Sequence, residues 1–573
     1  MIVLVTLLFF PMTVRATDEF VTIVNPVRIS TYNPNPAASI KAQYEIIKKF
    51  GLPATWLLTL DSLDQTGVVA ELKKFDQGQE LGLFLEVTKN SADKAGIAYH
   101  DTGSWHFANA VLLSGYTQPE RIKYIDYIFE RFKSIFGYYP KSVGSWWTDG
   151  YSLSYMHDKY GITADLGCSD QLETDNYSLL GQYWSVPYYP NKIHVGIPAS
   201  TQQDKLNVVR LLWAPRDPDL GYESSLYSTQ DYFTLPNLNI GYFKKLVETY
   251  AAKQSNQFGQ VTLGLESDFP PQSYLVNFLS QMEYLAQTAY QKVTMSQFAS
   301  YYQQKFTGLS PAHKIGKWYM SPRYRLGHKD GKIVDLRSYL SLPEPYYQRP
   351  NRENTLYINI ASAIDKKNDP QSVWNIGQGR VNTFKDYFEV YFPDSPPPPS
   401  LTNSGLFKVE KMADGYRIRV GKDSMSDITK EDWSPESVYS FRSKRFWTWK
   451  FERQKYLISA EEILALTKVL GKVLVYDHDC LQCEYHSEYK PAAILGVKGY
   501  IGQLSGKKVV YSREVFEIKD LLESEKTFKK LGVDYVYLTK YEQFIEKIPF
   551  SPGDWNLEKI YENGNAVVYR VVK

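Results

Sequence analysis

The 573-residue chain has little cysteine, no run of basic residues and no long hydrophobic segment. Its three cysteines fit either a reducing or an oxidising compartment. With 65 basic and 63 acidic residues the net charge is only +2, and a nucleic-acid surface needs a concentrated positive field. We therefore expect no nucleic-acid partner, and we expect no membrane span beyond residue 16.

Two of the cysteines form a C-x-x-C pair, Cys480 and Cys483, which is flanked by His478 and His486. Two Cys and two His side chains could ligate zinc, although this spacing is more cramped than that of a common zinc finger. In an exported protein the same pair could close a local disulfide. Both interpretations stay open, whereas the isolated Cys168 is expected to be a small buried hydrophobe.

Residues 1–16 resemble a secretory signal peptide. The apolar run at residues 2–10 is too short to span a bilayer, and V-R-A at residues 14–16 fits a small-residue cleavage site. The first residues contain no Lys or Arg before the apolar run, so an uncleaved anchor or a wrongly assigned start are alternatives. The prediction is a protein that is secreted, or located at the cell surface or in the periplasm.

Seven short apolar strands alternate with helices between residues 20 and 306. Near-continuous apolar strands favour a parallel sheet that is covered on both faces. Seven such units predict a closed or nearly closed (β/α)7-type barrel, with an open doubly wound sheet as the alternative. The strands are predicted at 20–29, 54–60, 80–87, 142–149, 162–166, 207–214 and 260–265. The helices are predicted at 39–50, 68–75, 119–136, 153–160, 240–253, 273–290 and 295–306.

The sequence of the remaining residues predicts two smaller domains. The predicted fold class is therefore α/β, with several domains. Residues 308–453 are rich in Pro and Tyr and contain alternating runs such as 355–360 and 416–420, which indicates β-structure. From residue 459 the pattern is α/β again and ends in a hairpin around Asn563. The predicted domains are a signal peptide (1–16), the barrel (17–306), a β-rich domain (307–455) and a small C-terminal α/β domain (456–573).

Acidic residues follow most of the predicted barrel strands. In a parallel barrel or open sheet, functional sites lie at the carboxyl ends of the strands. Acids in ordinary solvated loops would be scattered without preference for one end, so the pattern predicts one shared acidic cleft. The residues are Asp61, Glu86, Asp149, Asp170, Asp217, Glu266 and Asp268.

Paired carboxylates are the groups that cleave glycosidic bonds, one as acid and one as nucleophile or base. We predict Asp149 with Glu266 or Asp268 as the catalytic pair, facing each other across the barrel. Aromatic residues make up 15% of the chain, with 46 Tyr and 12 Trp, and sugars stack on such rings, although core packing is the alternative for each one. The predicted substrate contacts are Asp61, Glu86, His106, Trp146, Trp147, Asp170, Arg216 and Asp217.

Four segments in this order resemble the glycoside hydrolase/deacetylase β/α-barrel superfamily. They are A-T-W-L-L at 54–58, Q-E-L-G-L-F-L-E at 79–86, G-Y-Y-P-K-S-V-G-S-W-W at 137–147 and V-T-L-G-L-E-S-D at 261–268. The superfamily includes polysaccharide deacetylases of the NodB-homology type and family 57 glycoside hydrolases. The resemblance covers roughly residues 20–306 and implies a barrel that acts on a polysaccharide or oligosaccharide. Association with the cell envelope is a further expectation.

The chain departs from the metal-binding pattern of the deacetylases in this superfamily. Where the family has an Asp-Asp pair on the first strand, residues 25–28 read N-P-V-R, and Gln79 replaces the first expected histidine. Imidazole ligands cannot be replaced by such residues without losing metal affinity. His100 and His106 lie in a later loop, and their spacing does not demand recruitment to a metal. We therefore predict no metal and no cofactor, as in the related glycosidases, which use acids on strands four and seven, although family 57 enzymes usually have Glu on strand four.

Three functions remain as hypotheses: a secreted carbohydrate hydrolase, a catalytically inactive glycan-binding barrel, and a metal-dependent deacetylase with a rearranged metal site. Strand-end carboxylates roughly 5–10 Å apart would support hydrolysis. Carboxylates that are each paired with an arginine, such as Arg28 or Arg216, would support binding without catalysis. Two His and one Asp that converge on one point would support the deacetylase.

Overall fold

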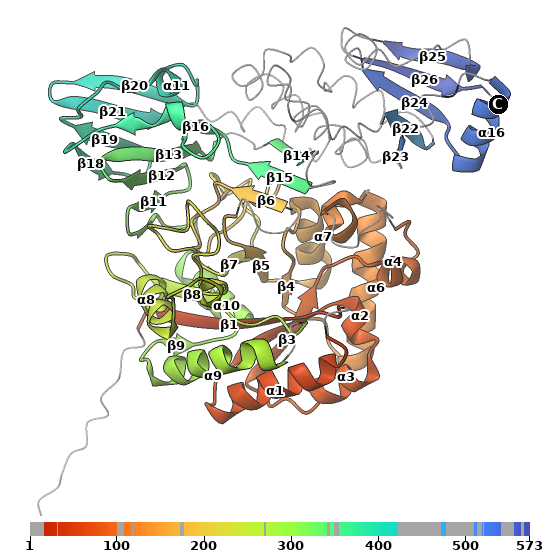
Figure 1. The fold of residues 1–573 in the computed structure, drawn as a ribbon, viewed down its shortest axis with the longest axis horizontal. Helices are drawn as coiled ribbons and strands as arrows, with labels where there is room; N and C mark the ends of the chain where they lie inside the picture. The colour runs from red at the N-terminus through yellow and green to blue at the C-terminus, as the bar shows by residue number, and fades with distance from the viewer. Residues whose placement is uncertain are drawn as a thin grey trace, which may run out of the picture.

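The fold is taken from a computed structural model of the chain (Figure 1). The structure describes residues 17–30, 33–99, 108–116, 118–171, 177–268, 271–340, 344–348, 355–421, 471–476, 509–512, 518, 521–539, 555–562 and 566–572. Several predictions concern residues outside these ranges: the signal peptide at 1–16, His100, His106 and the C-x-x-C pair with its two histidines.

A parallel sheet of seven main strands forms the N-terminal part of the molecule. Hydrogen bonds join them in the order β7-β5-β4-β3-β2-β1-β8, and all of these neighbours are parallel. A short strand, β9 (Gln291–Lys292), also pairs with β1. The main strands are β1 (Glu19–Val27), β2 (Ala54–Leu58), β3 (Gln79–Phe84), β4 (Ser142–Gly144), β5 (Ala164–Cys168), β7 (Val209–Trp213) and β8 (Gly259–Leu263). The hydrogen-bonded path ends at β7 and β8, so the predicted nearly closed barrel is confirmed.

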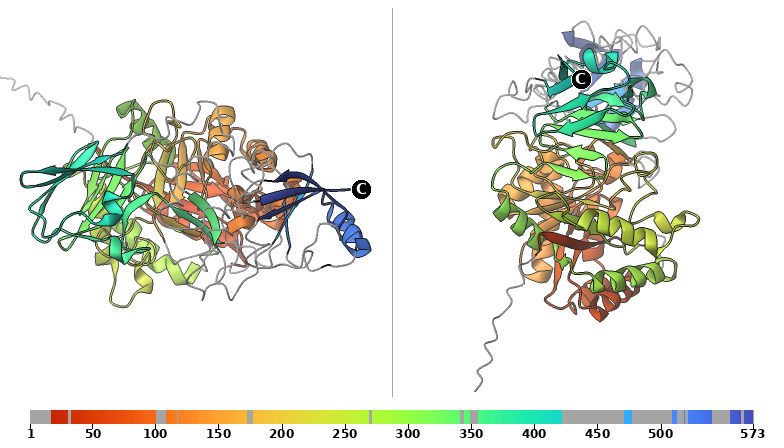
Figure 2. Two further views of the ribbon diagram at one scale, coloured as in Figure 1. Left: turned by 90° about the horizontal axis from the view of Figure 1, so that it is seen from above. Right: turned by 90° about the vertical axis from the view of Figure 1, so that its left-hand side faces the viewer.

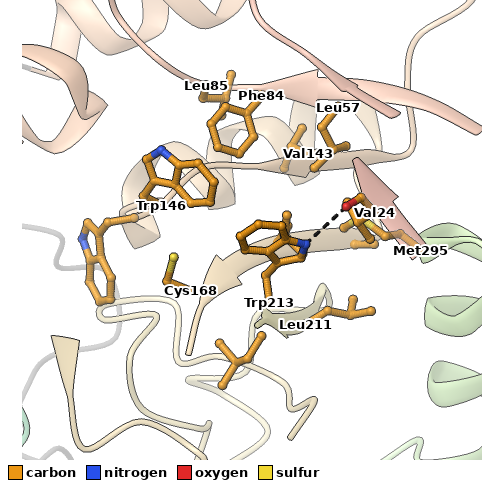
Figure 3. Close-up of a cluster of buried hydrophobic side chains, with 14 of the residues drawn as sticks. Val24, Leu57, Phe84, Leu85, Val143, Trp146, Cys168, Leu211, Trp213 and Met295 are labelled. Atoms are coloured by element: carbon orange, nitrogen blue, oxygen red, sulfur yellow. Dashed lines mark hydrogen bonds between the residues drawn. The ribbon is translucent and has the colours of Figure 1, made fainter. Parts of the chain in front are cut away.

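Large apolar side chains fill the interior of this barrel (Figure 3). Trp213 on β7 reaches across to β1, where its Nε1 donates to the carbonyl oxygen of Val24 at 3.2 Å. Its ring packs at 5.7 Å from the ring of Trp146, which lies 4.8 Å from Phe84 on β3. The barrel is therefore a packed core rather than a pore, and a ligand has to bind at the strand ends.

Helices follow most of the strands and cover the outside of the barrel, as predicted. The longer ones are α1 (Pro36–Lys49), α3 (Thr66–Leu72), α6 (Gln118–Phe136), α7 (Gly150–Tyr160), α8 (Ile240–Ala251), α9 (Pro271–Gln287) and α10 (Met295–Lys305). The shorter ones are α2 (Leu60–Leu63), α4 (Lys89–Ala95), α5 (Ala108–Val111) and two single 3₁₀ turns, η1 (Leu113–Gly115) and η2 (Tyr232–Thr234). No helix in the described ranges is long and apolar enough to cross a membrane.

Antiparallel sheets follow the barrel, so the predicted β-rich region is confirmed (Figure 2). One sheet contains β10 (His313–Ile315), β11 (Trp318–Met320), β12 (Tyr324–Lys329), β13 (Lys332–Ser338), β16 (Ser362–Asp365) and β17 (Trp374–Asn375), with a 3₁₀ turn, η3 (Pro370–Ser372). A second contains β18 (Arg380–Thr383), β19 (Tyr387–Tyr391), β20 (Phe407–Met412) and β21 (Gly415–Val420), beside the short helix α11 (Pro399–Thr402).

The described C-terminal residues form a mixed sheet and the helix α16, as the sequence predicts. Its strands are β22 (Val473–Tyr476), β23 (Val509–Ser512), β24 (Tyr535–Thr539), β25 (Leu557–Glu562) and β26 (Ala566–Val571), and its helix is α16 (Leu521–Leu531). β25 and β26 are the two strands of the predicted terminal hairpin.

The barrel and the β-rich region share one further sheet. β6 (Tyr177–Leu180), which the chain forms between β5 and β7, pairs in parallel with β15 (Thr355–Asn359), and β15 pairs with β14 (Glu344–Gln348). Nearby, the rings of Trp184 and Trp318 stack at 3.9 Å with an interplanar angle of 5°. These contacts tie the two regions together, while the exact domain boundaries stay predictions.

Candidate functional site

Arg28 gathers three of the strand-end carboxylates around one guanidinium group. Its Nε and Nη2 donate to both carboxylate oxygens of Glu86 at 2.9 and 2.7 Å. Its Nη1 donates to Glu266 at 2.7 Å and to Asp268 at 3.0 Å. We refer to Arg28, Glu86, Glu266 and Asp268 as the Arg28 cluster.

The cluster lies at the carboxyl ends of three strands of the sheet, since Glu86 follows β3 and both Glu266 and Asp268 follow β8. Arg28 comes directly after β1, and its backbone N–H donates to Ser267 Oγ at 3.0 Å. That bond holds the end of β1 against the segment after β8, which carries Glu266 and Asp268. The Nε1 of Trp146, which follows β4, donates at 3.1 Å to Glu86 Oε1, the oxygen that also accepts from Arg28 Nη2.

The Arg28 cluster is mostly buried. The side chains of Arg28, Glu86, Glu266 and Asp268 are 11%, 5%, 13% and 7% exposed. Burial opposes the charge of the guanidinium, but the carboxylates of Glu86, Glu266 and Asp268 outweigh it and raise the pKa of Arg28. Among these four described side chains, three carboxylates contact one guanidinium.

The shared arginine also limits how far apart the carboxylates can be. Glu266 and Asp268 both contact Nη1, at 2.7 and 3.0 Å, so the contacting oxygens lie within about 6 Å of each other. Glu86 and Glu266 contact the two ends of the same planar guanidinium, which places their contacting oxygens within about 8 Å. Both separations are compatible with the carboxyl spacing of glycosidases, about 5–9.5 Å.

Asp149, one of the predicted catalytic acids, has a different set of partners. It is the N-cap of α7, where it accepts from the backbone N–H and the hydroxyl of Ser152 at 2.9 and 2.7 Å. Arg121, whose side chain is 5% exposed, donates to it at 2.7 Å. Asp149 thus has a helix-capping and ion-pairing position, and its pairing with Glu266 or Asp268 in catalysis stays a prediction.

Asp61 and Asp217 make local contacts at other strand ends. Asp61 accepts from Thr88 Oγ1 at 2.6 Å and from Asn90 Nδ2 at 2.5 Å. Asp217 accepts from two backbone N–H groups two and three residues later, and from Tyr242 Oη at 2.8 Å. Their partners differ from those of the Arg28 cluster.

Asp170 and Arg216 are buried between the barrel and the β-rich region. Asp170 accepts from Arg325 at 2.6 Å and from the backbone N–H groups of residues 181 and 182. Arg216 donates to the carbonyl oxygen of Asp170 at 2.7 Å. Beside them lies a pocket of about 280 Å³, including its open mouth, lined by Asp170, Gln171, Leu180, Trp184, Gly221, Tyr222, Glu223, Ser224 and Ser225.

The two predicted sugar-contacting tryptophans lie in the core. Trp146 is 6% exposed and Trp147 is 3% exposed. Trp147 packs 5.3 Å from the ring of His194 and below the guanidinium of Arg210 at 5.5 Å. Trp146 meets the Arg28 cluster through its Nε1, which donates to Glu86, and through its ring, over which the Arg28 guanidinium lies at 5.4 Å. Sugar stacking on either ring stays a prediction, as does the contact predicted for His106.

Arg28 is the site residue whose central position the sequence does not reveal. Its signal in the sequence is weak: one arginine directly follows the first strand, at the same end of the barrel as the acids that follow the other strands. Which acids reach it depends on the strand order, in which β1 lies between β2 and β8. Cys168 is buried, as expected.

The described residues do not fit a metal site. No group of three or more His, Cys, Asp or Glu side chains among them could hold a metal ion. In the Arg28 cluster the guanidinium stands between the carboxylates, and its positive charge opposes a second cation bound at the same point. Asn25, which stands where the family has acids, donates instead to Gln43 Oε1 at 3.3 Å.

Comparisons with known proteins find similarity at the level of solved structures. No family model and no curated protein matches the chain. A glycoside hydrolase/deacetylase-type protein from Parabacteroides distasonis is 15% identical, with a TM-score of 0.42 over 57% of this chain and 86% of that chain. A polysaccharide-deacetylase-type protein from Mycobacterium smegmatis is 11% identical, with a TM-score of 0.31 over 52% and 94%.

A peptidoglycan deacetylase from Bacillus subtilis is 16% identical, with a TM-score of 0.25 over 50% of this chain and 93% of that chain. These similarities cover about half of the chain at low identity. The observed seven-stranded parallel sheet fits the β/α barrel that the sequence resemblance implies. What the barrel does depends on the chemistry of its own residues.

Proposed function

We propose that this protein is a carbohydrate hydrolase that acts on a polysaccharide or oligosaccharide through the carboxylates of the Arg28 cluster. The observation that supports this function is the convergence of Glu86, Glu266 and Asp268 on one guanidinium at the carboxyl ends of the barrel strands. Hydrolysis of a glycosidic bond needs two carboxyl groups at such a separation. We also propose that the protein is exported and works at or outside the cell envelope.

The contacts suggest different tasks for the carboxylates. Glu86 is fixed by two N–H groups of Arg28 and by Trp146 Nε1, so it is suited to stabilise or attack the anomeric carbon from a constant position. Glu266 has the most exposed side chain of the cluster, 13%, and accepts from Arg28 through its Oε2. It is therefore the better candidate to exchange a proton with the glycosidic oxygen.

A second function is favoured by the same arginine. Each cluster carboxylate is ion-paired, and Asp149 is ion-paired with Arg121. Carboxylates held in this way can orient hydroxyl groups of a sugar without cleaving it. The alternative is therefore a barrel that binds glycans but does not hydrolyse them.

Product analysis separates these functions. The full chain is incubated with mixed bacterial-envelope and plant glycans, and reducing ends and free acetate are both measured. A glycosidase releases reducing ends, and Glu266→Gln and Glu86→Gln each abolish the release. Glu45→Gln is the matched control, because Glu45 lies on α1 with a side chain 64% exposed.

Three results would contradict hydrolysis through this cluster. If acetate is released instead, and a chelator stops it, the protein is a metal-dependent deacetylase. If no product forms while a glycan still retards the protein on a native gel, the barrel is a binding module. Retention of full activity in both glutamine variants would place the chemistry elsewhere.

A further inference from the structure

We propose that one face of the antiparallel sheet β18-β19-β21-β20 binds an acidic polysaccharide whose sugars carry carboxylates. This surface is separate from the Arg28 cluster, and the proposal does not rest on hydrolysis by the barrel. The sheet lies at one end of the molecule (Figure 1). We call the side of this sheet that carries Arg380, Tyr387, Tyr391, Arg417 and Arg419 the outer face.

The alternation of side chains along the strands gives this sheet one apolar face and one polar face. Phe388, Val390 and Ile418 are 0–1% exposed and belong to a core shared with the neighbouring antiparallel sheet. Successive side chains of a strand point to opposite sides of the sheet. The outer face therefore points away from this core.

Two matching pairs of arginine and tyrosine lie on the outer face. Tyr391 on β19 is opposite Arg380 on β18, whose guanidinium lies 5.0 Å from the centre of the tyrosine ring. Tyr387, also on β19, is opposite Arg419 on β21, whose guanidinium lies 4.8 Å from the centre of that ring. The two tyrosines are about 13 Å apart along the strand. A repeated arrangement of this kind suits a polymer with a repeated unit.

Cations outnumber carboxylates among the strand residues of the outer face. Glu389 pairs with Arg417 at 2.6 Å, and Glu410 pairs with Arg419 at 3.3 Å. Arg380 is exposed and forms no ion pair with any residue that the structure describes. A guanidinium offers a planar fork of N–H donors that matches a carboxylate. The cations are Arg380, Lys408, Arg417 and Arg419, and the carboxylates are Glu389 and Glu410.

An exposed aromatic ring beside these pairs provides an apolar surface for a sugar. Phe384, in the turn between β18 and β19, is 40% exposed. It stacks on Tyr387 with the ring centres 4.6 Å apart and an interplanar angle of 20°. The C–H groups of a sugar can pack on this ring while its carboxylate meets the guanidinium of Arg419.

The distribution of charge favours a polysaccharide over a nucleic acid. Binding to a nucleic acid needs a dense positive field opposite closely spaced phosphates, whereas Glu389 and Glu410 lie among the arginines of the outer face. Each sugar of a polyuronate offers one carboxylate and one apolar ring face. This combination matches one arginine–tyrosine pair.

Titration with two matched oligosaccharides tests the proposal. The full chain is titrated by calorimetry at low salt with an oligogalacturonate, and with the same oligomer after methyl esterification of its carboxylates. We expect the free carboxylates to improve binding by about tenfold or more, and we expect this preference to shrink as the salt concentration rises.

Two arginine variants locate the binding surface. Arg380→Gln combined with Arg419→Gln should weaken binding of the oligogalacturonate by about tenfold or more. Arg419 is 42% exposed, and Arg570 in the C-terminal sheet is 52% exposed and also pairs with a glutamate. Arg570→Gln is therefore the matched control, and it should leave the affinity unchanged.

Three outcomes would overturn the proposal. Equal binding of the two oligomers would show that the carboxylates are not recognised. Unchanged affinity in the variant with both Arg380→Gln and Arg419→Gln would place the ligand elsewhere on the protein. Tighter binding of polyglutamate than of the oligogalacturonate would assign the outer face to an acidic peptide instead of a polysaccharide.

Discussion

The molecule contains two groups of arginine and carboxylate side chains that differ in balance and in burial. In the Arg28 cluster one guanidinium meets three carboxylates with side chains 5–13% exposed. In the second group, which we call the junction network, Arg325 joins Asp170 to Asp335, and Arg337 joins Asp335 to Asp365. These five side chains are 0–3% exposed.

The difference indicates two kinds of task. The junction network places two guanidinium groups among three carboxylates, so most of its charge is neutralised by its own members. It links the end of β5 to β12, β13 and β16, and it therefore fixes the β-rich region on the barrel. The Arg28 cluster lies at the carboxyl ends of the barrel strands and its side chains are more exposed, which is consistent with the catalytic task proposed for it.

Arg325→Met should give the largest loss of stability. It leaves Asp170 and Asp335 buried without their shared cation, and breaking a buried pair in this way costs about 3–5 kcal/mol. Urea unfolding followed by tryptophan fluorescence measures the loss, because Trp184 and Trp318 lie 5.4 and 4.9 Å from the Arg325 guanidinium.

Arg323→Met is the matched control for this experiment. Arg323 is two residues away and pairs with Asp386 at 2.7 Å, but these side chains are 33% and 57% exposed. An exposed pair contributes about 0–1 kcal/mol. Similar losses in the two variants would contradict the view that the junction network holds the barrel and the sheet together.

Glu266→Gln should have the opposite profile. If Glu266 transfers the proton in glycan hydrolysis, its loss reduces kcat by about 10²–10⁴-fold. The substitution keeps the size of the side chain and leaves Arg28 with the carboxylates of Glu86 and Asp268, so we expect the free energy of unfolding to change by less than about 1 kcal/mol. A large loss of stability with unchanged kcat would assign the Arg28 cluster to folding instead.

The sequence predicts the barrel well because its signal is local. Each strand is a short apolar run, and each is followed by a segment with helical spacing, so strands such as 54–60 and 207–214 need no knowledge of the fold. The carboxyl-end rule then places the acids at one end of the barrel. Glu86, Glu266 and Asp268 could be grouped in this way from the sequence alone.

The partners of the acids could not be predicted, because they come from distant parts of the chain. Asp170 pairs with Arg325, 155 residues later, and its environment depends on how the β-rich region packs on the barrel. Asp149 directly precedes α7 and caps it by accepting from the backbone N–H of Ser152. An aspartate directly before a helix is a local pattern that can be recognised in the sequence. Its ion pair with Arg121 depends on how α6 packs beside α7, and neither segment's sequence predicts that packing.

The pH dependence of stability tests the barrel–sheet boundary at a second point. His313 on β10 packs 4.9 Å from the ring of Phe258, and burial lowers its pKa to about 3. The unfolded chain binds a proton near pH 6.5 and the folded protein does not, so this contribution to stability is fully present above pH 6.5 and is lost as the pH falls toward 3. Between pH 7 and pH 4 we expect a loss of about 3 kcal/mol from this group.

His313→Gln should remove this part of the pH dependence, which urea unfolding at several pH values measures. Lys314→Gln, at the exposed neighbouring position, should keep it. If the His313→Gln protein loses stability between pH 7 and pH 4 as steeply as the unaltered protein, His313 is not the group responsible.

Asp149→Asn should have the smallest effect and decides how far the catalytic site extends from the Arg28 cluster. Asparagine caps a helix about as well as aspartate, so α7 should persist. The lost charge leaves Arg121 with a weaker partner, and a hydrogen bond to a charged group contributes about 1.5–3 kcal/mol. From the contacts of Asp149 we therefore expect a stability loss of about 2 kcal/mol and a kcat within tenfold of the unaltered protein. A drop in kcat of a hundredfold or more at unchanged stability would instead establish the catalytic role that the sequence predicts for Asp149.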